Sequence, residues 1–586
     1  MSSIPNEILR DIFKYFTPRR PEHNFRITLT HVCRRWRAIA IELHSLWTFP
    51  DFRSPELATE MLKRSGGAPL HIEFKYTKHS RKTNDRLPKE VILARTETLY
   101  DTHRHLPRLK TLKLLRMSPR VMENLAAKYV QAAPNLRSLE LQVQSGDGYD
   151  LPLNFLGGHA PLLRRLILDD CGLAYNSPLT HNLTSLELTG SKTAFAQLFC
   201  MALRFMPVLK RLSLNEVYCN DPGDGIIAVL PKLHRLDLNF SLLEGTSIFK
   251  HISFPATTYV QVDIHVSESE SESEDPELAT IGDVDSFWRD IGRILAPGFC
   301  PEGERVVKTL EVDGDDVNDG LSFAVRGWDT VVPWDSMLVY SDNIDTRPFP
   351  NLQVVVDWSE LEGDESISFF EDLFKAAFHA LRLPMLETLC FAEFPGWQDG
   401  TYSEHNFLVE ALRPHLWTAP IQTLILSVEH SAMDIPVLLA YQSPDSDQPL
   451  PLPTLETLVL NYFTFEHELV DDLYNSLKRR MRRGMKLKKQ VVRNSENYSG
   501  SDLKSFREVV EEVDWDEDYA IYIEEEEEEE ESAESEADSE GSGYEFADSD
   551  RSSIPEFQPA RPSSPRRWIE RRIYPTSYYG ASSSRQ

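Results

Sequence analysis

The chain has 586 residues, with 62 Lys or Arg against 92 Asp or Glu and a formal charge of −30. Residues 511–550 hold much of this acidity and no Lys or Arg, so the charge describes one segment more than the whole protein. The six cysteines form no CxxC spacing, which argues against a disulfide framework or a zinc site. No apolar run is long enough to cross a bilayer and no signal pattern opens the chain, so we expect a soluble cytoplasmic or nuclear protein.

Two apolar helical patterns lie in residues 1–50. The first follows Pro5, a residue suited to a helix start, and carries Ile8, Leu9, Ile12 and Phe13 on one face. The second runs through Val32, Cys33 and Trp36 toward Leu46 and Trp47. At most three short helices in so few residues rarely complete a core of their own. The pattern therefore predicts that part of this apolar surface meets a partner.

The quoted residues resemble a known family. IPNEILRDIFKYF followed by LTHVCRRWRAIAIELHSLW is similar to the F-box, whose pattern is LPxEIL, then IF, VCRxWR and LW. The spacer TPRRPEHNFRI is longer than the common form and leaves the family's Asp-Leu step without a clear match. The resemblance implies docking onto the SKP-type adaptor of a cullin-RING ubiquitin ligase. It implies these adaptor-binding residues: Ile4, Pro5, Ile8, Leu9, Ile12, Phe13, Val32, Cys33, Trp36, Leu46 and Trp47. The alternative is that Trp36 and Trp47 only cap the repeats that follow.

Residues 51–105 are predicted to form a linker and an N-terminal cap. The stretch WTFPDF…EMLKRSGGAPLHIEF resembles the continuation seen in F-box proteins of mushroom-forming fungi, in which a helix ending in a Ser-Gly turn precedes the first strand.

A repeat occupies residues 106–265. Its unit is Leu, two residues, Leu, one residue, Leu, and six copies start at Leu109, Leu136, Leu163, Leu183, Leu209 and Leu233. Side chains alternate along a strand, so the last two Leu of each copy face one way. One such strand cannot bury its leucines alone, whereas stacked copies share a continuous core. The period and LLRRLILDDCGL resemble leucine-rich repeats.

Weaker copies follow an acidic insertion loop and a helix in residues 266–300. In residues 301–490 they read VKTLEV, NLQVVVD with Leu352 and Val355, MLETLCF, IQTLIL and TLETLVL. Residues 491–586 are predicted to be a disordered tail with an acidic run. The predicted fold class is therefore α/β: a three-helix F-box unit, a leucine-rich-repeat solenoid with a parallel sheet on its concave face and helices outside, and the acidic tail.

The residues that alternate with the core leucines should line the concave face. They include the predicted target-binding residues Lys113, Glu140, Arg165, Arg211 and Arg235, with the three arginines in one column. Arginine forks suit carboxylates or phosphates, which favours an acidic or phosphorylated ligand. The alternative is a solvated surface on which these arginines lie among neighbouring acids.

No catalytic pattern accompanies these features: the sequence has no P-loop, HExxH or GxSxG. We therefore expect a non-catalytic protein without a cofactor. Its predicted function is the substrate-recognition subunit of an SCF-type ubiquitin ligase, with the adaptor, the cullin ligase and an unknown target protein as partners, and with no membrane and no nucleic acid. Two alternatives stay open, an acidic nuclear repeat protein that binds histones and a scaffold with a degenerate F-box.

Overall fold

The computed structural model divides into two compact units, residues 1–522 and 523–586. It describes residues 4–516 except 16–24, 78–86, 145–147, 175, 192–198, 218–226, 242–245, 266–280, 297–298, 301–302, 318–319, 339–347, 359–363, 393–406, 428–433, 441–449 and 466. The acidic repeat SESESESEDP and the long acidic run of the predicted tail therefore lie outside the described residues. No described helix is both long and apolar enough to span a membrane.

Short helices come first, as the sequence predicts. They are α1 (Asn6–Tyr15), α2 (Phe25–Val32), α3 (Arg34–Glu42) and the single 3-10 turn η1 (His44–Trp47). The predicted linker holds a further helix, α4 (Pro55–Arg64), the first strand and α5 (Lys89–Asp101). This segment is therefore part of the folded body that follows.

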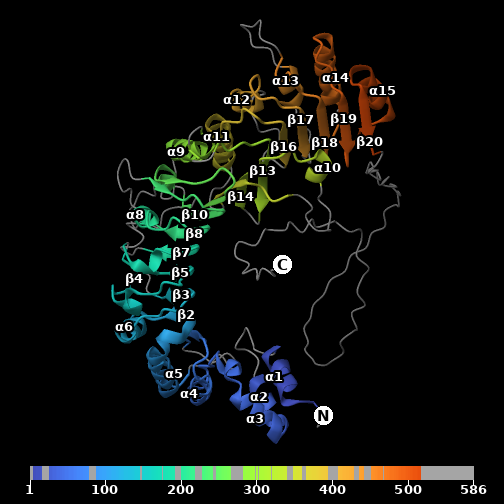
Figure 1. Cartoon of the computed structure of the whole chain (residues 1–586). Coiled ribbons are helices and arrows are strands. Elements are labelled where there is room, and N and C mark those ends of the chain that lie inside the picture. The colour runs from blue at the N-terminus through green and yellow to red at the C-terminus, as the bar shows by residue number, and fades with distance from the viewer. Residues whose placement is uncertain are drawn as a thin grey trace, which may run out of the picture. The chain divides into compact units, whose positions relative to one another are not determined.

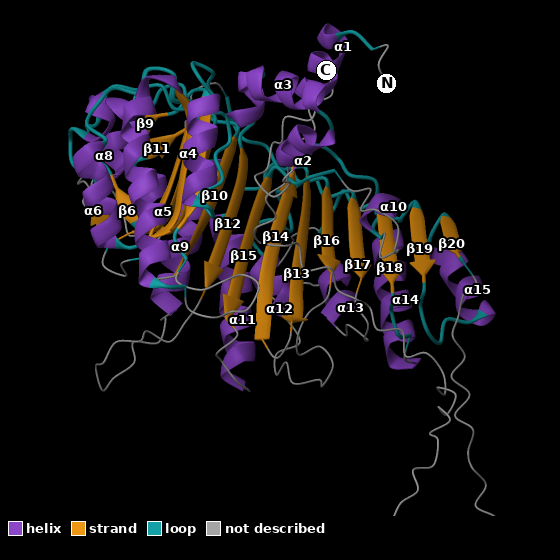
Figure 2. Cartoon of the chain, turned by 90° about the horizontal axis from the view of Figure 1, so that it is seen from below, coloured by secondary structure: helices purple, strands orange, loops and turns teal. Residues whose placement is uncertain are grey.

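Sixteen of the described strands form one sheet, and all of its neighbouring pairs outside the central three strands are parallel (Figure 1). The first eight strands in spatial order are parallel to one another: β1 (Leu70–Lys75), β2 (Leu109–Met117), β3 (Ser138–Val143), β5 (Arg165–Asp169), β7 (Ser185–Ser191), β8 (Arg211–Val217), β10 (Arg235–Ser241) and β12 (Tyr259–His265). The central three are β15 (Leu352–Trp358), β14 (Gly320–Trp328) and β13 (Thr309–Val317). The last five are again parallel: β16 (Thr388–Ala392), β17 (Thr423–Ser427), β18 (Thr457–Asn461), β19 (Lys489–Arg493) and β20 (Glu512–Trp515). Figure 2 shows β12 to β20 side by side.

Helices and short turns cover one face of this sheet, which we call the helical face; the other is the open face. The connecting helices are α6 (Pro119–Lys128), α8 (Phe199–Leu203), α9 (Ile281–Gly292), α11 (Asp364–Ala380), α12 (Phe407–Leu412), α13 (Asp434–Ala440), α14 (His467–Arg482) and α15 (Gly500–Val509). The 3-10 turns are η2 (Thr102–Arg108), η3 (Phe155–Gly158), η4 (Pro178–Thr180), η5 (Thr246–Lys250) and η6 (Arg293–Leu295). Two small sheets pair β4 (Tyr149–Asp150) with β6 (Cys171–Gly172) and β9 (Ala228–Val229) with β11 (Ile252–Ser253).

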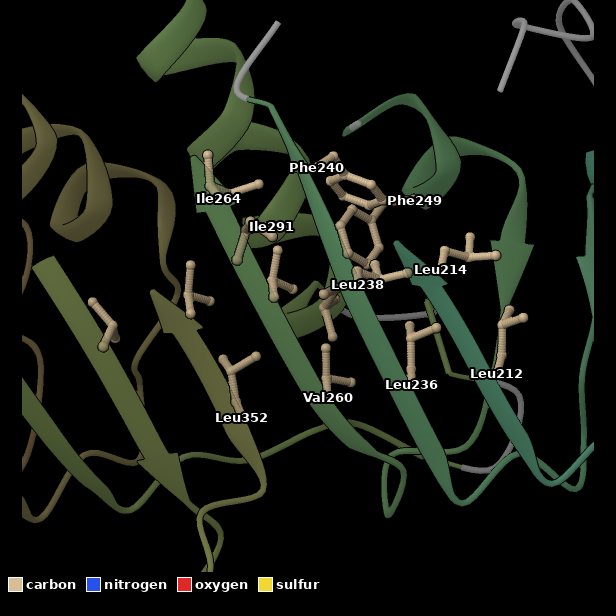
Figure 3. Packing of buried hydrophobic residues seen from close by; sticks show 14 of the residues in the cluster. Leu212, Leu214, Leu236, Leu238, Phe240, Phe249, Val260, Ile264, Ile291 and Leu352 are labelled. Atoms are coloured by element: carbon tan, nitrogen blue, oxygen red, sulfur yellow. The ribbon is translucent and has the colours of Figure 1, made fainter. Parts of the chain in front are cut away.

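The core follows from the alternation of side chains. Leu212 of β8 is in register with Leu236 of β10, Val260 of β12 and Leu352 of β15, and all four are buried. Figure 3 shows these side chains standing in a row on one side of neighbouring strands. One continuous apolar cluster extends in this way from Phe52 to Val513. Burying a Leu or Val contributes roughly 1.5–3 kcal/mol, so the row of stacked copies supplies most of the driving force.

The centre of the sheet departs from the predicted order of copies. VKTLEV, in β13, was expected to follow β12, but β15 lies next to β12 and β13 lies next to β16. Strand β14 fills the gap and is antiparallel to both β13 and β15. The cause is a β-hairpin, in which β14 folds straight back beside β13 instead of returning through a helix.

The prediction that Leu352 and Val355 are the core residues of this copy is also wrong for Val355. Val354 and Val356 are buried with Leu352, whereas Val355 is half-buried on the other face. Three consecutive valines hide the alternation, so the sequence alone did not show which of them point inward.

Ordered structure continues past residue 491, where the tail was predicted to begin. Helix α15 starts with a capping box between Ser499 and Asp502, and β20 pairs with β19. Tyr498 packs against the rings of Phe506 and Trp515 at centroid distances of 6.1 and 5.2 Å. These aromatic rings cover the end of the core, so the described structure extends to residue 516.

Candidate functional site

The N-terminal helices enclose a small core of their own. Leu9 and Phe13 of α1 point inward, and their partners come from the next helices and from α4. The buried members of this cluster are Leu9, Phe13, Leu29, Ile39, Ala40, Leu46, Trp47 and Met61. Because Met61 belongs to α4, beyond residue 50, the first fifty residues do not complete this core alone, and a later helix of the same chain contributes to it.

Trp47 belongs to this core. Its indole Nε1 donates to the Ala40 carbonyl at 2.9 Å, and the Arg64 guanidinium of α4 lies 4.7 Å from its ring centroid. Trp36 is half-buried, and its ring meets the edge of Phe13 at 5.1 Å. The two tryptophans therefore divide, with Trp47 internal and Trp36 at the rim.

Several apolar side chains stay exposed on α1 and α2. Ile8 is 50% exposed, Ile12 38% and Val32 52%. Tyr15, which the sequence reasoning missed, is 90% exposed. Ile8, Ile12 and Tyr15 follow the i, i+4, i+7 spacing of one helical face, and that spacing was the signal that could have found Tyr15.

The remaining predicted adaptor-binding residues fall into two groups. Pro5 and Cys33 are exposed, Ile4 is half-buried, and the Cys33 thiol accepts the Trp36 N–H at 3.4 Å as the N-cap of α3. Leu9, Phe13, Leu46 and Trp47 are buried in the chain's own core. In this conformation these four side chains are turned away from the solvent and pack against one another and their neighbours.

Comparison with known families gives one result for this region. A family model described as F-box-like matches residues 1–53. Residues 1–53 form an F-box-like domain. No curated protein matches the chain.

The F-box-like domain is fastened to the first strand of the sheet. The His71 N–H of β1 donates to the Thr48 carbonyl at 2.9 Å, and the imidazole of His71 stacks on Phe49 at 4.3 Å. Arg95 of α5 donates to the Phe52 carbonyl, also at 2.9 Å. Burial of the His71 imidazole and the positive charge of Lys110 lower the pKa of His71 to about 4. The ring that stacks on Phe49 is therefore neutral at neutral pH.

The open face carries the five predicted target-binding residues. The register places Lys113 opposite Glu140, and it places Arg165, Ser185, Arg211 and Arg235 in one row. Lys113 and Glu140 form an ion pair of 2.7 Å in which Glu140 is buried, so this pair is already satisfied within the chain.

The arginines differ in how firmly they are held. Arg165 approaches Glu187 only at 3.9 Å, and Arg235 binds Asp237 at 2.8 Å while its guanidinium lies 4.9 Å from the Tyr259 ring centroid. Burial raises the pKa of Glu187, a shift that Arg165 and Arg211 oppose. Burial raises the pKa of Asp263, farther along the face, to about 6.

A segment of the chain covers the open face over β16 to β19, and we call this segment, residues 328–338, the strap. It leaves β14 and includes α10 (Trp334–Met337), which Figure 1 shows on the opposite face of the sheet from α11 to α15. Trp328, Val332 and Met337 are buried against a row of apolar side chains on β16 to β19. That row consists of Cys390, Ile425, Val459 and Val491.

The strap is anchored at both ends. The Val332 N–H donates to the Thr309 hydroxyl, which donates to the Thr330 carbonyl, at 2.9 and 3.0 Å. The Trp328 indole donates to the Pro348 carbonyl at 2.7 Å, and Arg493 of β19 lies 5.6 Å from the Trp334 ring centroid. Among the described residues, the strap does not pack on the N-terminal part of the open face, where the arginines lie. Among the described residues, no group of three or more His, Cys, Asp or Glu is placed to hold a metal ion.

Proposed function

We propose that this protein is the substrate-recognition subunit of a cullin-RING, SCF-type ubiquitin ligase. In this proposal the F-box-like domain docks onto the SKP-type adaptor. The strand–helix units are leucine-rich repeats whose open face holds the target protein. The chain itself supplies no catalytic group, and a complex of this kind works in the cytoplasm or the nucleus.

One observation carries the proposal: Ile8 and Ile12 are exposed on one face of α1, in an F-box-like domain whose own core is already filled. Exposed apolar residues grouped on one helix face are typical of a helix-in-groove contact. Holding a target beside the ligase raises the effective concentration of its lysines, which accelerates transfer without a catalytic residue in this chain.

The test replaces Ile8 and Ile12 together by Ala and measures binding of the full chain to purified adaptor by isothermal titration calorimetry. We expect a loss on the order of 2–4 kcal/mol, because truncated anchors at the centre of an interface dominate its affinity. Leu9 is left intact because its removal would damage the core.

A matched control truncates two exposed aliphatic residues on another helix, Val91→Ala with Leu93→Ala on α5. Its affinity should equal that of the unaltered chain. If the Ile8 and Ile12 variant bound the adaptor as tightly as the control, the proposed role of the F-box-like domain would be wrong.

A further inference from the structure

The N-terminal part of the open face is bordered by a row of basic residues. Each of the strands β2, β3, β5, β7, β8 and β10 has, at its start or just before it, one exposed or half-exposed position that follows the first leucine of its copy. These positions hold Lys110, Arg137, Arg164, Thr184, Lys210 and His234. Consecutive members are joined through the backbone, since the N–H of each donates to the carbonyl of the one before at 2.8–3.0 Å. Four of the six are Lys or Arg, so most of the row is positively charged.

A second row lies directly beside it. The next residue of each strand belongs to the open face, and here Arg165, Arg211 and Arg235 are separated only by hydroxyl side chains. Neither row contains an acidic residue in these six strands. We call the two rows together the basic edge.

Several of these cations are not neutralised within the described part of the chain. The side chains of Arg137 and Lys210 are exposed, and neither has a hydrogen bond or ion pair there. Arg211 is exposed too and has no ion pair among the described residues, although it lies near enough to Glu187 to affect that carboxylate. In a protein with a formal charge of −30, three neighbouring cations without an ion pair among the described residues favour binding of an anionic ligand at this edge.

The basic edge is narrow and has defined ends. Neighbouring strands are about 4.8 Å apart, so the six strands span roughly 24 Å, the length of about seven extended residues. Two residues farther along the strands, about 6.6 Å away, stand the carboxylates of Glu140, Glu187 and Asp237. In the later strands Glu387 and Glu456 occupy the corresponding edge position, paired with Lys308 and Lys488 at 3.3 and 2.6 Å. The cations are therefore confined to a strip one chain wide.

We infer that the basic edge binds an extended acidic or phosphorylated segment of the target protein. This inference deepens the proposed function, on which it rests for naming that partner as the ligase's target. A single extended chain fits the strip, because its acidic side chains can meet the arginine forks while its far side stays clear of the carboxylates. A nucleic-acid duplex is wider and would overlap Glu187 and Asp237. The guanidinium of Arg235 covers the ring of Tyr259, so that ring is not free to stack on the bases of a single strand.

The experiment measures fluorescence anisotropy of a labelled ten-residue peptide of alternating Glu and Ser, titrated with the full chain at low salt. The variant Arg137→Gln, Lys210→Gln and Arg211→Gln removes three charges from the basic edge. We expect it to weaken binding at least tenfold, and we expect binding to the unaltered chain to weaken steeply with added salt. A control removes three exposed charges elsewhere, Arg482→Gln, Arg483→Gln and Lys504→Gln, and should stay within twofold of the unaltered chain.

Three outcomes would overturn the inference: equal affinity of the edge variant and the unaltered chain, an equal loss in the control, or equal binding of a Gln and Ser peptide. Tighter binding of a ten-nucleotide single-stranded DNA than of the peptide would also overturn it, in favour of nucleic acid. A thermal unfolding measurement on each variant checks that the variant is folded. Adaptor affinity is measured on the same variants, so loss of peptide binding and loss of adaptor binding are separate results.

Discussion

Charged side chains in this protein do not all serve as surface groups. Arg480 lies in the basic stretch KRRMRRGMKLKK, yet it is fully buried and donates to the carbonyls of Leu439, Pro451 and Leu452 at 3.2, 2.6 and 2.7 Å. Arg305 is likewise buried and donates to the carbonyls of Asn351 and Thr258. Such arginines satisfy carbonyl groups where helices and strands end inside the protein.

Asp263 has a buried carboxyl whose protonation makes the stability of the fold depend on pH. Arg235, Asp237, Gln261 and His265 surround its carboxyl, and burial raises its pKa to about 6, above the usual value near 4. The folded state thus favours the protonated form, and this contribution to stability is present below about pH 4 and lost as the pH rises through about 6.

We therefore expect Asp263→Asn to raise the free energy of unfolding by on the order of 1–3 kcal/mol at pH 7 and to have little effect at pH 4. Urea unfolding followed by circular dichroism at both pH values checks this. Asp335→Asn, at an exposed site on the strap, is the control and should change neither value. Parallel pH profiles for Asp263→Asn and the unaltered chain would contradict the prediction.

At the scale of elements, the close contact between the ends of α9 and α11 depends on one glycine. Gly292 ends α9 where it meets the end of α11, and a Cβ at this position would lie 2.4 Å from the Ala380 carbonyl oxygen. The helices must separate to admit a methyl group, which disturbs the packing of both against the central strands.

Gly292→Ala should therefore lower the free energy of unfolding by about 1–3 kcal/mol, as overpacking does in well-packed cores. Gly500→Ala is the matched control, because nothing lies within 4 Å of the added methyl. Chemical denaturation of both variants gives the comparison. A Gly292→Ala protein as stable as the control would show that α9 and α11 can separate freely.

The elements also show what the sequence could and could not predict. The early copies were predicted because polar and apolar residues alternate when one face of a strand is exposed. In β16 the strap covers the second face, all five residues of TLCFA are buried, and the alternation disappears. The exposed stripe at Ile8 and Ile12 followed from helical spacing. The burial of Trp47 could not be predicted from the F-box pattern. Its partners Met61 and Arg64 lie outside the segment that the pattern covers.

At the scale of the whole molecule, the sheet needs an end as well as a core. The rings of Tyr498, Phe506 and Trp515 close the core beyond β19, and β20 covers the β19 edge. An uncovered, apolar edge strand is a template for aggregation.

A chain that ends at Asp516 should therefore keep the thermal unfolding midpoint of the full chain, whereas one that ends at Ser495 should unfold at least several degrees lower and aggregate. Differential scanning fluorimetry with light scattering measures both. Equal midpoints and equal scattering would mean that α15 and β20 do not close the sheet.

The position of β15 has a consequence for synthesis. The edge of β12 is covered by β15, while β13 and β14 are made earlier and lie elsewhere in the folded sheet. About ninety residues separate the end of β12 from the end of β15, so at ordinary translation rates the edge waits roughly 5 to 20 seconds on the ribosome. The half of the sheet nearest the F-box-like domain can fold in this interval, but it does so with one open side. The nascent chain is most in need of a chaperone at that time.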